Sequence, residues 1–155
     1  MPPDAAADST KSAWNALLDA SVQKIAIANP AHAPYGRAAV AALKKAGIYE
    51  RVQAKLVYGE NISQAAQFVY SGNAQAGIVA LSLALSPAMK NGKRWEIPPE
   101  MHPPIRQAAV VLSRAEDKIT ARSFLDFVIS ATGKHILATY GFAPPASVDS
   151  RSRPN

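Results

Sequence analysis

Short apolar runs alternate with amphipathic segments along the first half of the chain. Three runs predict β-strands, at residues 24–28 (KIAIA), 55–58 (KLVY) and 76–81 (AGIVAL). Between them, residues 36–45 and 62–70 carry apolar side chains at helical spacing. This strand–helix–strand–helix–strand order predicts a parallel sheet with right-handed crossovers, and therefore an α/β fold.

The pattern changes toward both ends. Residues 12–20 predict a short helix, whereas residues 94–97 and 107–113 predict strands separated by an irregular, proline-rich connection. Residues 119–140 carry the longest helical pattern. Its apolar stripe comprises Phe124, Leu125, Val128, Ile129, Thr132 and Ile136. The stripe needs a surface to pack against, yet only one convincing strand is predicted near it in the sequence.

Composition narrows the possible classes of protein. The 155 residues are 48% hydrophobic and 18% charged, as in a globular chain. The absence of cysteine excludes disulfides, thiolate zinc sites and cysteine nucleophiles. Residues 1–12 have neither a basic nor an apolar region, so no signal peptide is expected. The apolar stretch 74–89 is too short to span a bilayer.

The net charge of +6 favours an anionic partner, which leaves nucleic acid, anionic lipid and small oxyanions open. The densest basic run, residues 90–94, holds three basic residues around one glycine. A run of this kind is typical of a solvated loop, so no nucleic-acid partner is predicted.

The first strand–helix junction, NPAHAPYG at residues 29–36, has the features of a helix start. Pro34 suits the first helical position, which leaves the N–H groups of Tyr35 and Gly36 without acceptors inside the helix. Such N–H groups lie at the positive end of the helix dipole. They are therefore candidate donors to an anion.

The second junction, YGENISQA at residues 58–65, repeats this arrangement. Asn61 is a good N-cap, and Gln64 completes a capping-box pattern, which leaves Ile62 and Ser63 with free N–H groups. Parallel strands end at the same sheet edge, so both helix starts are expected at one cleft. Together they would form an anion site without a charged side chain, although ordinary capped helices show the same pattern.

Other chemistry has little support in the sequence. His32, His102 and His135 are scattered and lack partners at metal-ligand spacing. His32 lies in the first junction, where we expect a surface or loop-bracing histidine, with ligand contact as the alternative. Ser63 and Ser82 lack a nucleophile-elbow context, so acyl-transfer chemistry has no support. Because the sequence assembles neither an acid–base pair nor a nucleophile, an enzyme is the least favoured class.

Three motifs resemble the second lobe of the periplasmic molybdate-binding proteins of ABC importers. They are NPAHAPYG (29–36), YGENISQA (58–65) and GNAQAGIVALS (72–82). Residues 95–112 and 124–142 resemble the return strand and the C-terminal helix of the same family, so the likeness covers about Ile25 to Phe142. The resemblance implies a type II periplasmic-binding-protein fold with a mostly parallel sheet.

The resemblance also implies a ligand and its donors. In the family, two lobes hold tetrahedral molybdate or tungstate through backbone N–H and hydroxyl groups. Tyr35 matches one backbone donor of lobe two, and Ile62, where valine is common, matches the other. Molybdenum is therefore expected only as the bound oxyanion, with no resident cofactor. Ala80 departs from members that place a ligand-contacting tyrosine there.

By this resemblance the chain divides into four parts. Residues 1–23 approach the hinge, 24–106 form a complete ligand-binding lobe two, 107–142 form the return strand and C-terminal helix of lobe one, and 143–155 form a disordered tail. Most of lobe one, with its hydroxyl donors, is not in the chain. We therefore expect weak molybdate binding by the chain alone, and self-association through the apolar stripe.

The resemblance thus implies a binding protein, not an enzyme, that delivers molybdate or tungstate to an ABC permease from the periplasm. Sulfate or phosphate is the alternative ligand within this class. A cytoplasmic oxyanion-sensing module is the alternative class, which the lack of an export signal in the sequence favours.

Overall fold

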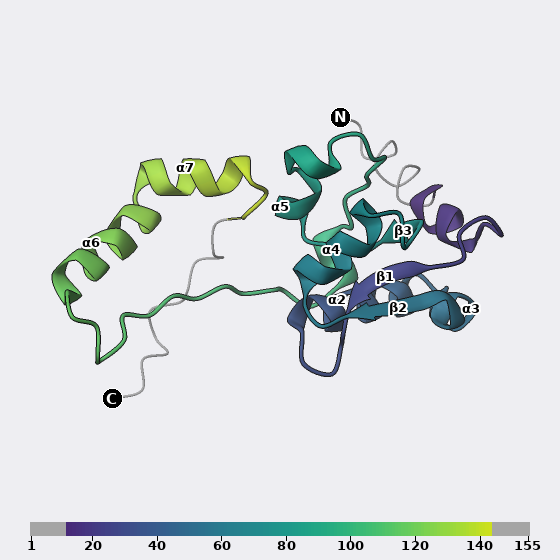
Figure 1. Cartoon of the computed structure of the whole chain (residues 1–155), viewed down its shortest axis with the longest axis horizontal. Coiled ribbons are helices and arrows are strands. Elements are labelled where there is room, and N and C mark those ends of the chain that lie inside the picture. Colours follow the sequence, from purple (N-terminus) through teal and green to yellow (C-terminus); the bar gives the residue numbers. More distant parts are fainter. Residues whose placement is uncertain (1–11, 144–155) are drawn as a thin grey trace. The chain divides into compact units, whose positions relative to one another are not determined.

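The computed structural model describes residues 12–143, which fall into two units (Figure 1). The described residues up to Ile105 form unit 1, and those from Arg106 onward form unit 2. Unit 1 holds a three-stranded parallel sheet in the order β2–β1–β3. Its strands are β1 (Ile25–Ala28), β2 (Leu56–Gly59) and β3 (Ala76–Gly77). The predicted parallel pairing is confirmed.

Short helices connect the strands of unit 1. The α-helices are α2 (Pro34–Lys45), α3 (Tyr49–Val52), α4 (Ile62–Tyr70) and α5 (Leu81–Ala84), and residues 12–18 are also helical. Single 3-10 turns are η1 (Gln53–Lys55), η2 (Pro87–Met89) and η3 (Pro99–Met101). Gly47 and Gly72 follow α2 and α4 with φ values of 71° and 75°, so the predicted helix ends are confirmed.

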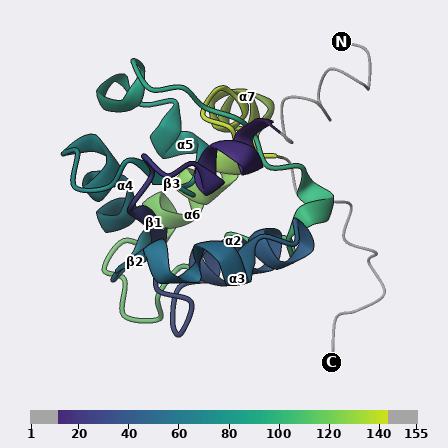
Figure 2. The same ribbon diagram turned by 90° about the vertical axis from the view of Figure 1, so that its right-hand side faces the viewer.

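Side-chain alternation along β1 gives the sheet two covered faces. Ile25 and Ile27 are fully buried on one face, where they pack with Leu43 of α2 and Val52 of α3. Ala26 points to the other face and packs with Ala65 of α4. The helices α2 and α3 therefore lie on one side of the sheet and α4 on the other (Figure 2). This two-sided burial explains why β1 is apolar throughout.

The third strand is shorter than predicted. After Gly77, one more bond joins Ile78 N–H to the Ala26 carbonyl at 2.9 Å. The chain then turns away, because Ala80 becomes the residue that precedes α5. Of the apolar residues 78–81, the first three therefore connect the strand to α5 and the last begins that helix, so none of them continues the strand.

Unit 2 contains two helices where one long helix was predicted. These are α6 (Lys118–Ile129) and α7 (Ala131–Thr139). Ser130 separates them with an extended ψ of 169°, and its hydroxyl accepts a bond from Gly133 N–H at 3.1 Å. The prediction of one continuous helix is wrong because Ser130 is an N-cap, not a helix interior. Gly141, with a φ of 79°, follows the end of α7.

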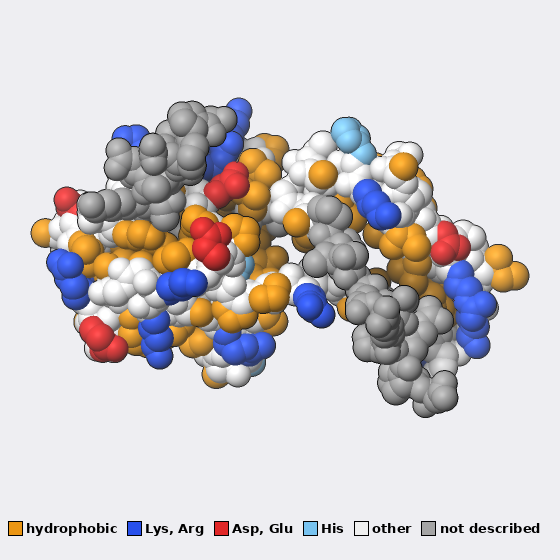
Figure 3. Space-filling model, turned by 180° about the vertical axis from the view of Figure 1, so that it is seen from behind, with side chains coloured by type: hydrophobic (Ala, Val, Ile, Leu, Met, Phe, Trp, Pro, Cys, Tyr) orange, Lys and Arg blue, Asp and Glu red, His pale blue; other side chains and the backbone are white. Residues whose placement is uncertain are grey.

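The predicted strands at 94–97 and 107–113 are not formed. A strand needs a hydrogen-bonded neighbour, and in the part of the chain that is described, neither segment has one. The apolar stripe of unit 2 is correspondingly open, with Phe124 and Ile129 each 63% exposed. Orange hydrophobic side chains are visible on the surface of this unit in the right-hand part of Figure 3. The predicted disordered tail begins at Ala143, the last described residue, and otherwise lies outside the described range.

No helix among residues 12–143 is both long and apolar enough to cross a membrane.

Candidate anion-binding site

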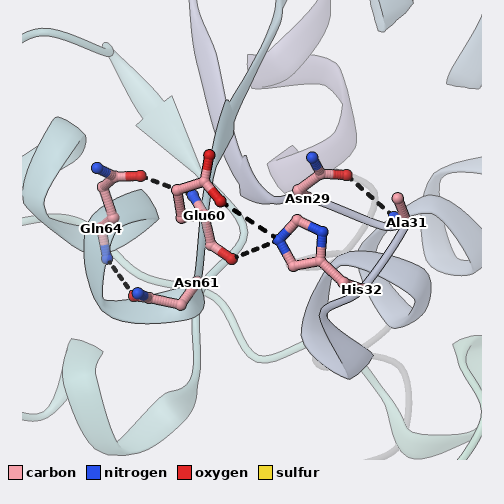
Figure 4. Close-up of polar contacts among 6 residues, drawn as sticks. All are labelled: Asn29, Ala31, His32, Glu60, Asn61 and Gln64. Atoms are coloured by element: carbon pink, nitrogen blue, oxygen red, sulfur yellow. Dashed lines mark hydrogen bonds and ion pairs between the residues drawn. The ribbon is translucent and has the colours of Figure 1, made fainter.

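The two predicted helix starts lie at the same edge of the sheet. In the parallel register, Ala28 at the end of β1 lies opposite Gly59 at the end of β2. One further backbone bond, from Asn29 N–H to the Gly59 carbonyl at 2.8 Å, extends this pairing beyond the strands. The turn at 29–33 and the turn at 60–61 therefore begin side by side, as Figure 4 shows.

The first turn is folded by its own backbone and by Asn29. The Asn29 side-chain oxygen accepts a bond from Ala31 N–H at 3.0 Å, and the backbone carbonyl of Asn29 accepts one from Ala33 N–H at 2.9 Å. Pro34 then begins α2, and Ala33 provides no side-chain cap. Tyr35 N–H has no acceptor among the described residues, as predicted.

The prediction for Gly36 is wrong. Its N–H donates to the Ala33 carbonyl at 3.1 Å in a tight first turn. A 3-10-type bond of this kind is a common way to satisfy an N–H group at a helix end. The first turn therefore presents Tyr35, and not Gly36, as its candidate donor.

The second turn is capped in a nearly reciprocal way (Figure 4). The Asn61 side-chain oxygen accepts a bond from Gln64 N–H at 3.0 Å. In return, the Gln64 side-chain oxygen accepts a bond from Glu60 N–H at 2.6 Å, one residue before the usual capping-box donor. Ile62 and Ser63 N–H have no acceptor among the described residues, as predicted. The cap thus fixes the turn while leaving both N–H groups available.

Two glycines allow α2 to lie close to the end of β1 and α4 to lie close to the end of β2. A Cβ on Gly36 would lie 2.1 Å from the Ala28 carbonyl oxygen, and one on Gly59 would lie 2.7 Å from Ala65 N. Both distances are far below a normal contact with backbone atoms. Only glycine therefore permits this packing of α2 on β1 and of α4 on β2.

A histidine joins the two turns. His32 Nε2 lies 2.9 Å from the Glu60 carbonyl oxygen and 3.6 Å from Glu60 Oε2. Both side chains are largely exposed, at 52% and 79%. The expectation that His32 braces its loop is confirmed. Its partner was not predicted, because the two residues are 28 positions apart and no local pattern relates them.

The candidate donors of this arrangement are neutral backbone N–H dipoles. Within residues 12–143, no group of three or more His, Asp or Glu side chains could hold a metal ion. Ala80 is buried and contributes no hydroxyl. The unpartnered N–H groups of Tyr35 and Ile62 lie at helix N-termini, where the helix dipole favours negative charge. Such a site is suited to binding an anion.

Comparison with known proteins agrees with the fold. A profile of the bacterial extracellular solute-binding protein family matches residues 1–143. The solved structure of the Azotobacter vinelandii periplasmic molybdate-binding protein superimposes with a TM-score of 0.75 at 30% identity. The match covers 84% of this chain and 58% of that chain. The predicted α/β periplasmic-binding-protein-like fold is therefore confirmed for a part of such a protein.

Two sequence relatives carry the same description. The chain is 38% identical over 127 residues to the molybdate-binding protein ModA of Rhodobacter capsulatus, covering 82% of this chain and 50% of that protein. It is 40% identical over 119 residues to ModA of Azotobacter vinelandii, covering 76% and 47% respectively. The chain thus spans about half the length of the curated relatives that it matches. Since the family profile covers nearly all of its residues, the chain belongs to the bacterial extracellular solute-binding proteins.

Proposed function

We propose that this chain binds molybdate, as part of a substrate-binding protein that delivers the oxyanion to an ABC permease. The observation that carries the proposal is the pair of unpartnered N–H groups, Tyr35 and Ile62, at one edge of the sheet. The relatives described as molybdate-binding supply the ligand class. Tungstate has the same charge and shape, so we propose that it binds as well. The ligand is the cargo, and no cofactor is proposed.

Neutral donors suffice to hold such a dianion. A hydrogen bond to a charged group contributes about 1.5–3 kcal/mol, more than a bond between neutral groups. Fixed N–H groups at two helix ends add the favourable potential of both dipoles. Sulfate and phosphate are also tetrahedral, so we propose that selectivity comes from the size of the site rather than from charge.

The comparisons also guide the proposed location. The Azotobacter vinelandii relative of known structure is described as periplasmic, and the family as extracellular solute-binding proteins. We therefore propose that this chain works in the periplasm. A reporter fusion that carries the native upstream sequence tests this, since export would argue against the alternative of a cytoplasmic oxyanion sensor.

To test the site, the isotope-labelled chain is titrated with molybdate while the NMR signals of its backbone amides are recorded. NMR detects weak binding, which matters because the chain spans about half of its relatives. We expect the Tyr35 and Ile62 amide signals to shift with molybdate and tungstate, and much less with sulfate or phosphate. No specific shift at these residues would reject the proposed site.

Variants of Tyr35 identify the contacting atom. Tyr35→Pro removes the N–H donor, and we expect it to weaken binding about ten- to a hundredfold, equivalent to about 1.5–3 kcal/mol. Tyr35→Phe keeps the N–H and is the matched control, with an affinity close to that of the unaltered chain. Thermal unfolding of both variants tests whether the fold is retained. An equal loss in Phe and Pro would make the phenol the contact and contradict the assignment.

A further inference from the structure

The bond between His32 and Glu60 has a defined direction. A carbonyl oxygen can only accept, so the proton in the 2.9 Å contact must lie on His32 Nε2. The contact therefore selects one tautomer of the neutral ring. His102 provides a contrast, because its Nδ1 lies 2.8 Å from the Pro103 carbonyl oxygen and must carry the proton there.

The bond lies where the two turns that follow β1 and β2 would otherwise separate. The β1–β2 ladder ends at Ala28 and Gly59, and the last backbone link is the bond from Asn29 N–H to the Gly59 carbonyl. Beyond it, no further backbone bond between the two turns occurs among the described residues. The His32 ring spans this gap and reaches the next carbonyl along, that of Glu60.

Glu60 is thereby held on both sides. Its N–H donates to the Gln64 side chain of its own helix at 2.6 Å, and its carbonyl accepts from His32 of the other turn at 2.9 Å. The Glu60 carbonyl lies two residues before Ile62, and His32 lies three residues before Tyr35. A shift of either turn would therefore change the spacing between the two candidate donors.

We propose that His32 is a positioning residue that fixes the spacing of the two anion-binding turns through its bond to the Glu60 carbonyl. The inference rests on the proposed anion site and adds a determinant of its affinity. His32 does not need to touch the anion. It reduces the freedom that the Tyr35 and Ile62 N–H groups would otherwise lose on binding.

The Glu60 side chain has a separate and opposing effect. Its carboxylate lies 3.6 Å from His32 Nε2, is 79% exposed, and brings negative charge close to a site for a dianion. Exposed ion pairs of this kind contribute little to stability. The backbone bond, rather than the ion pair, therefore carries the positioning role, and Glu60→Gln separates the two because it retains the carbonyl.

The first measurement is the tautomer of His32 in the unaltered chain. Ring nitrogen NMR at alkaline pH, where imidazoles are neutral, distinguishes a protonated Nε2 from a protonated Nδ1. We expect His32 to carry the proton on Nε2 and His102 to carry it on Nδ1. A His32 ring protonated on Nδ1 would overturn the proposal, whether or not the chain binds an anion.

The second measurement is the molybdate affinity of variants in the same full chain, from the amide titration. We expect His32→Ala to weaken binding about two- to tenfold, the range for loss of one ordinary hydrogen bond. His32→Gln can donate to the same carbonyl, so it is expected to restore most of the affinity. His135→Ala, far along the sequence in α7, is the control and should have no effect.

The outcomes separate this inference from the proposed function. If the unaltered chain shows no molybdate response at Tyr35 and Ile62, the proposed function fails. If it responds and His32→Ala responds with equal affinity, the positioning role alone fails. If Glu60→Gln weakens binding as much as His32→Ala, the ion pair positions the turns and the assignment to the carbonyl is wrong. We expect Glu60→Gln to bind molybdate as well as the unaltered chain or better.

Discussion

Replacement of Gly36 by alanine tests how closely α2 must approach the sheet. Gly36 lies in the first turn of α2, where a Cβ would meet the Ala28 carbonyl oxygen at 2.1 Å and the Asn29 carbonyl carbon at 2.8 Å. These are backbone atoms of the β1 end, so no side-chain rotation can relieve the contact. The helix must instead move away from β1 by about 1 Å, which is the overpacked situation that strains a core.

The size of the effect follows from two opposing contributions. Alanine favours a helix over glycine by about 1 kcal/mol. Overpacking in a well-packed site costs about 1–3 kcal/mol, and a clash with fixed backbone lies at the upper end of that range. Moving α2 also disturbs the fully buried Leu43, which packs on β1. We therefore expect Gly36→Ala to lower the free energy of unfolding by about 2 kcal/mol, a large part of the stability of a small domain.

The assay is urea unfolding of the whole chain, followed by circular dichroism. Gly92→Ala is the matched control, because its Cβ would lie 3.4 Å from the Met89 carbonyl oxygen, an ordinary contact. We expect a lower urea midpoint for Gly36→Ala only, together with weaker molybdate shifts at the adjacent Tyr35 N–H. Equal midpoints for Gly36→Ala and the unaltered chain would show that α2 does not pack on β1 as described.

Two further predictions concern unit 2. The Thr120 hydroxyl and the Thr120 N–H both bond to Asp117 and hold the pKa of its carboxyl below the usual value. The cap should therefore stabilise α6 fully at a pH above the pKa that Asp117 has in the unfolded chain. This stabilisation should be lost as the pH falls through the lowered pKa of the folded state. Helicity by circular dichroism that is insensitive to acid in this range would contradict the assignment. Phe124 and Ile129 are each 63% exposed, so we expect the chain to self-associate at micromolar concentration. Sedimentation should show an oligomer that becomes monomeric when both are replaced by serine, and a monomeric unaltered chain would refute this.

The central parts of unit 1 could be predicted because their signals are local. The run IAIA is apolar at every position, which is typical of a strand covered on both faces. Its two isoleucines and two alanines are indeed fully buried. Asn61 and Gln64 form a cap that depends on residues three positions apart. Each of these features is determined by neighbours in sequence, so the pattern was sufficient.

The failures have several causes. Residues 107–113 have the composition of a strand, but a strand exists only where another strand pairs with it, and sequence composition carries no information about that partner. The break at Ser130 has a local signal, since serine is a good N-cap, but the apolar stripe on both sides suggested continuity. Gly36 N–H was expected to be free because the first N–H groups of a regular α-helix have no acceptor, whereas the tight first turn of α2 supplies the Ala33 carbonyl.

The candidate site shows why charge alone was a weak guide to function. The net charge of +6 favoured an anionic partner, yet the two turns present N–H groups of an uncharged tyrosine and an uncharged isoleucine. The ionisable groups that join the turns are His32 and Glu60, and the carboxylate of the latter opposes an anion. Binding by fixed dipoles requires accurate spacing, because the directional bonds of two separate helices must converge on one small ligand. The parallel ladder, the two glycines and the His32 bond all act on that spacing, and this is why residues without charge can form the proposed oxyanion site.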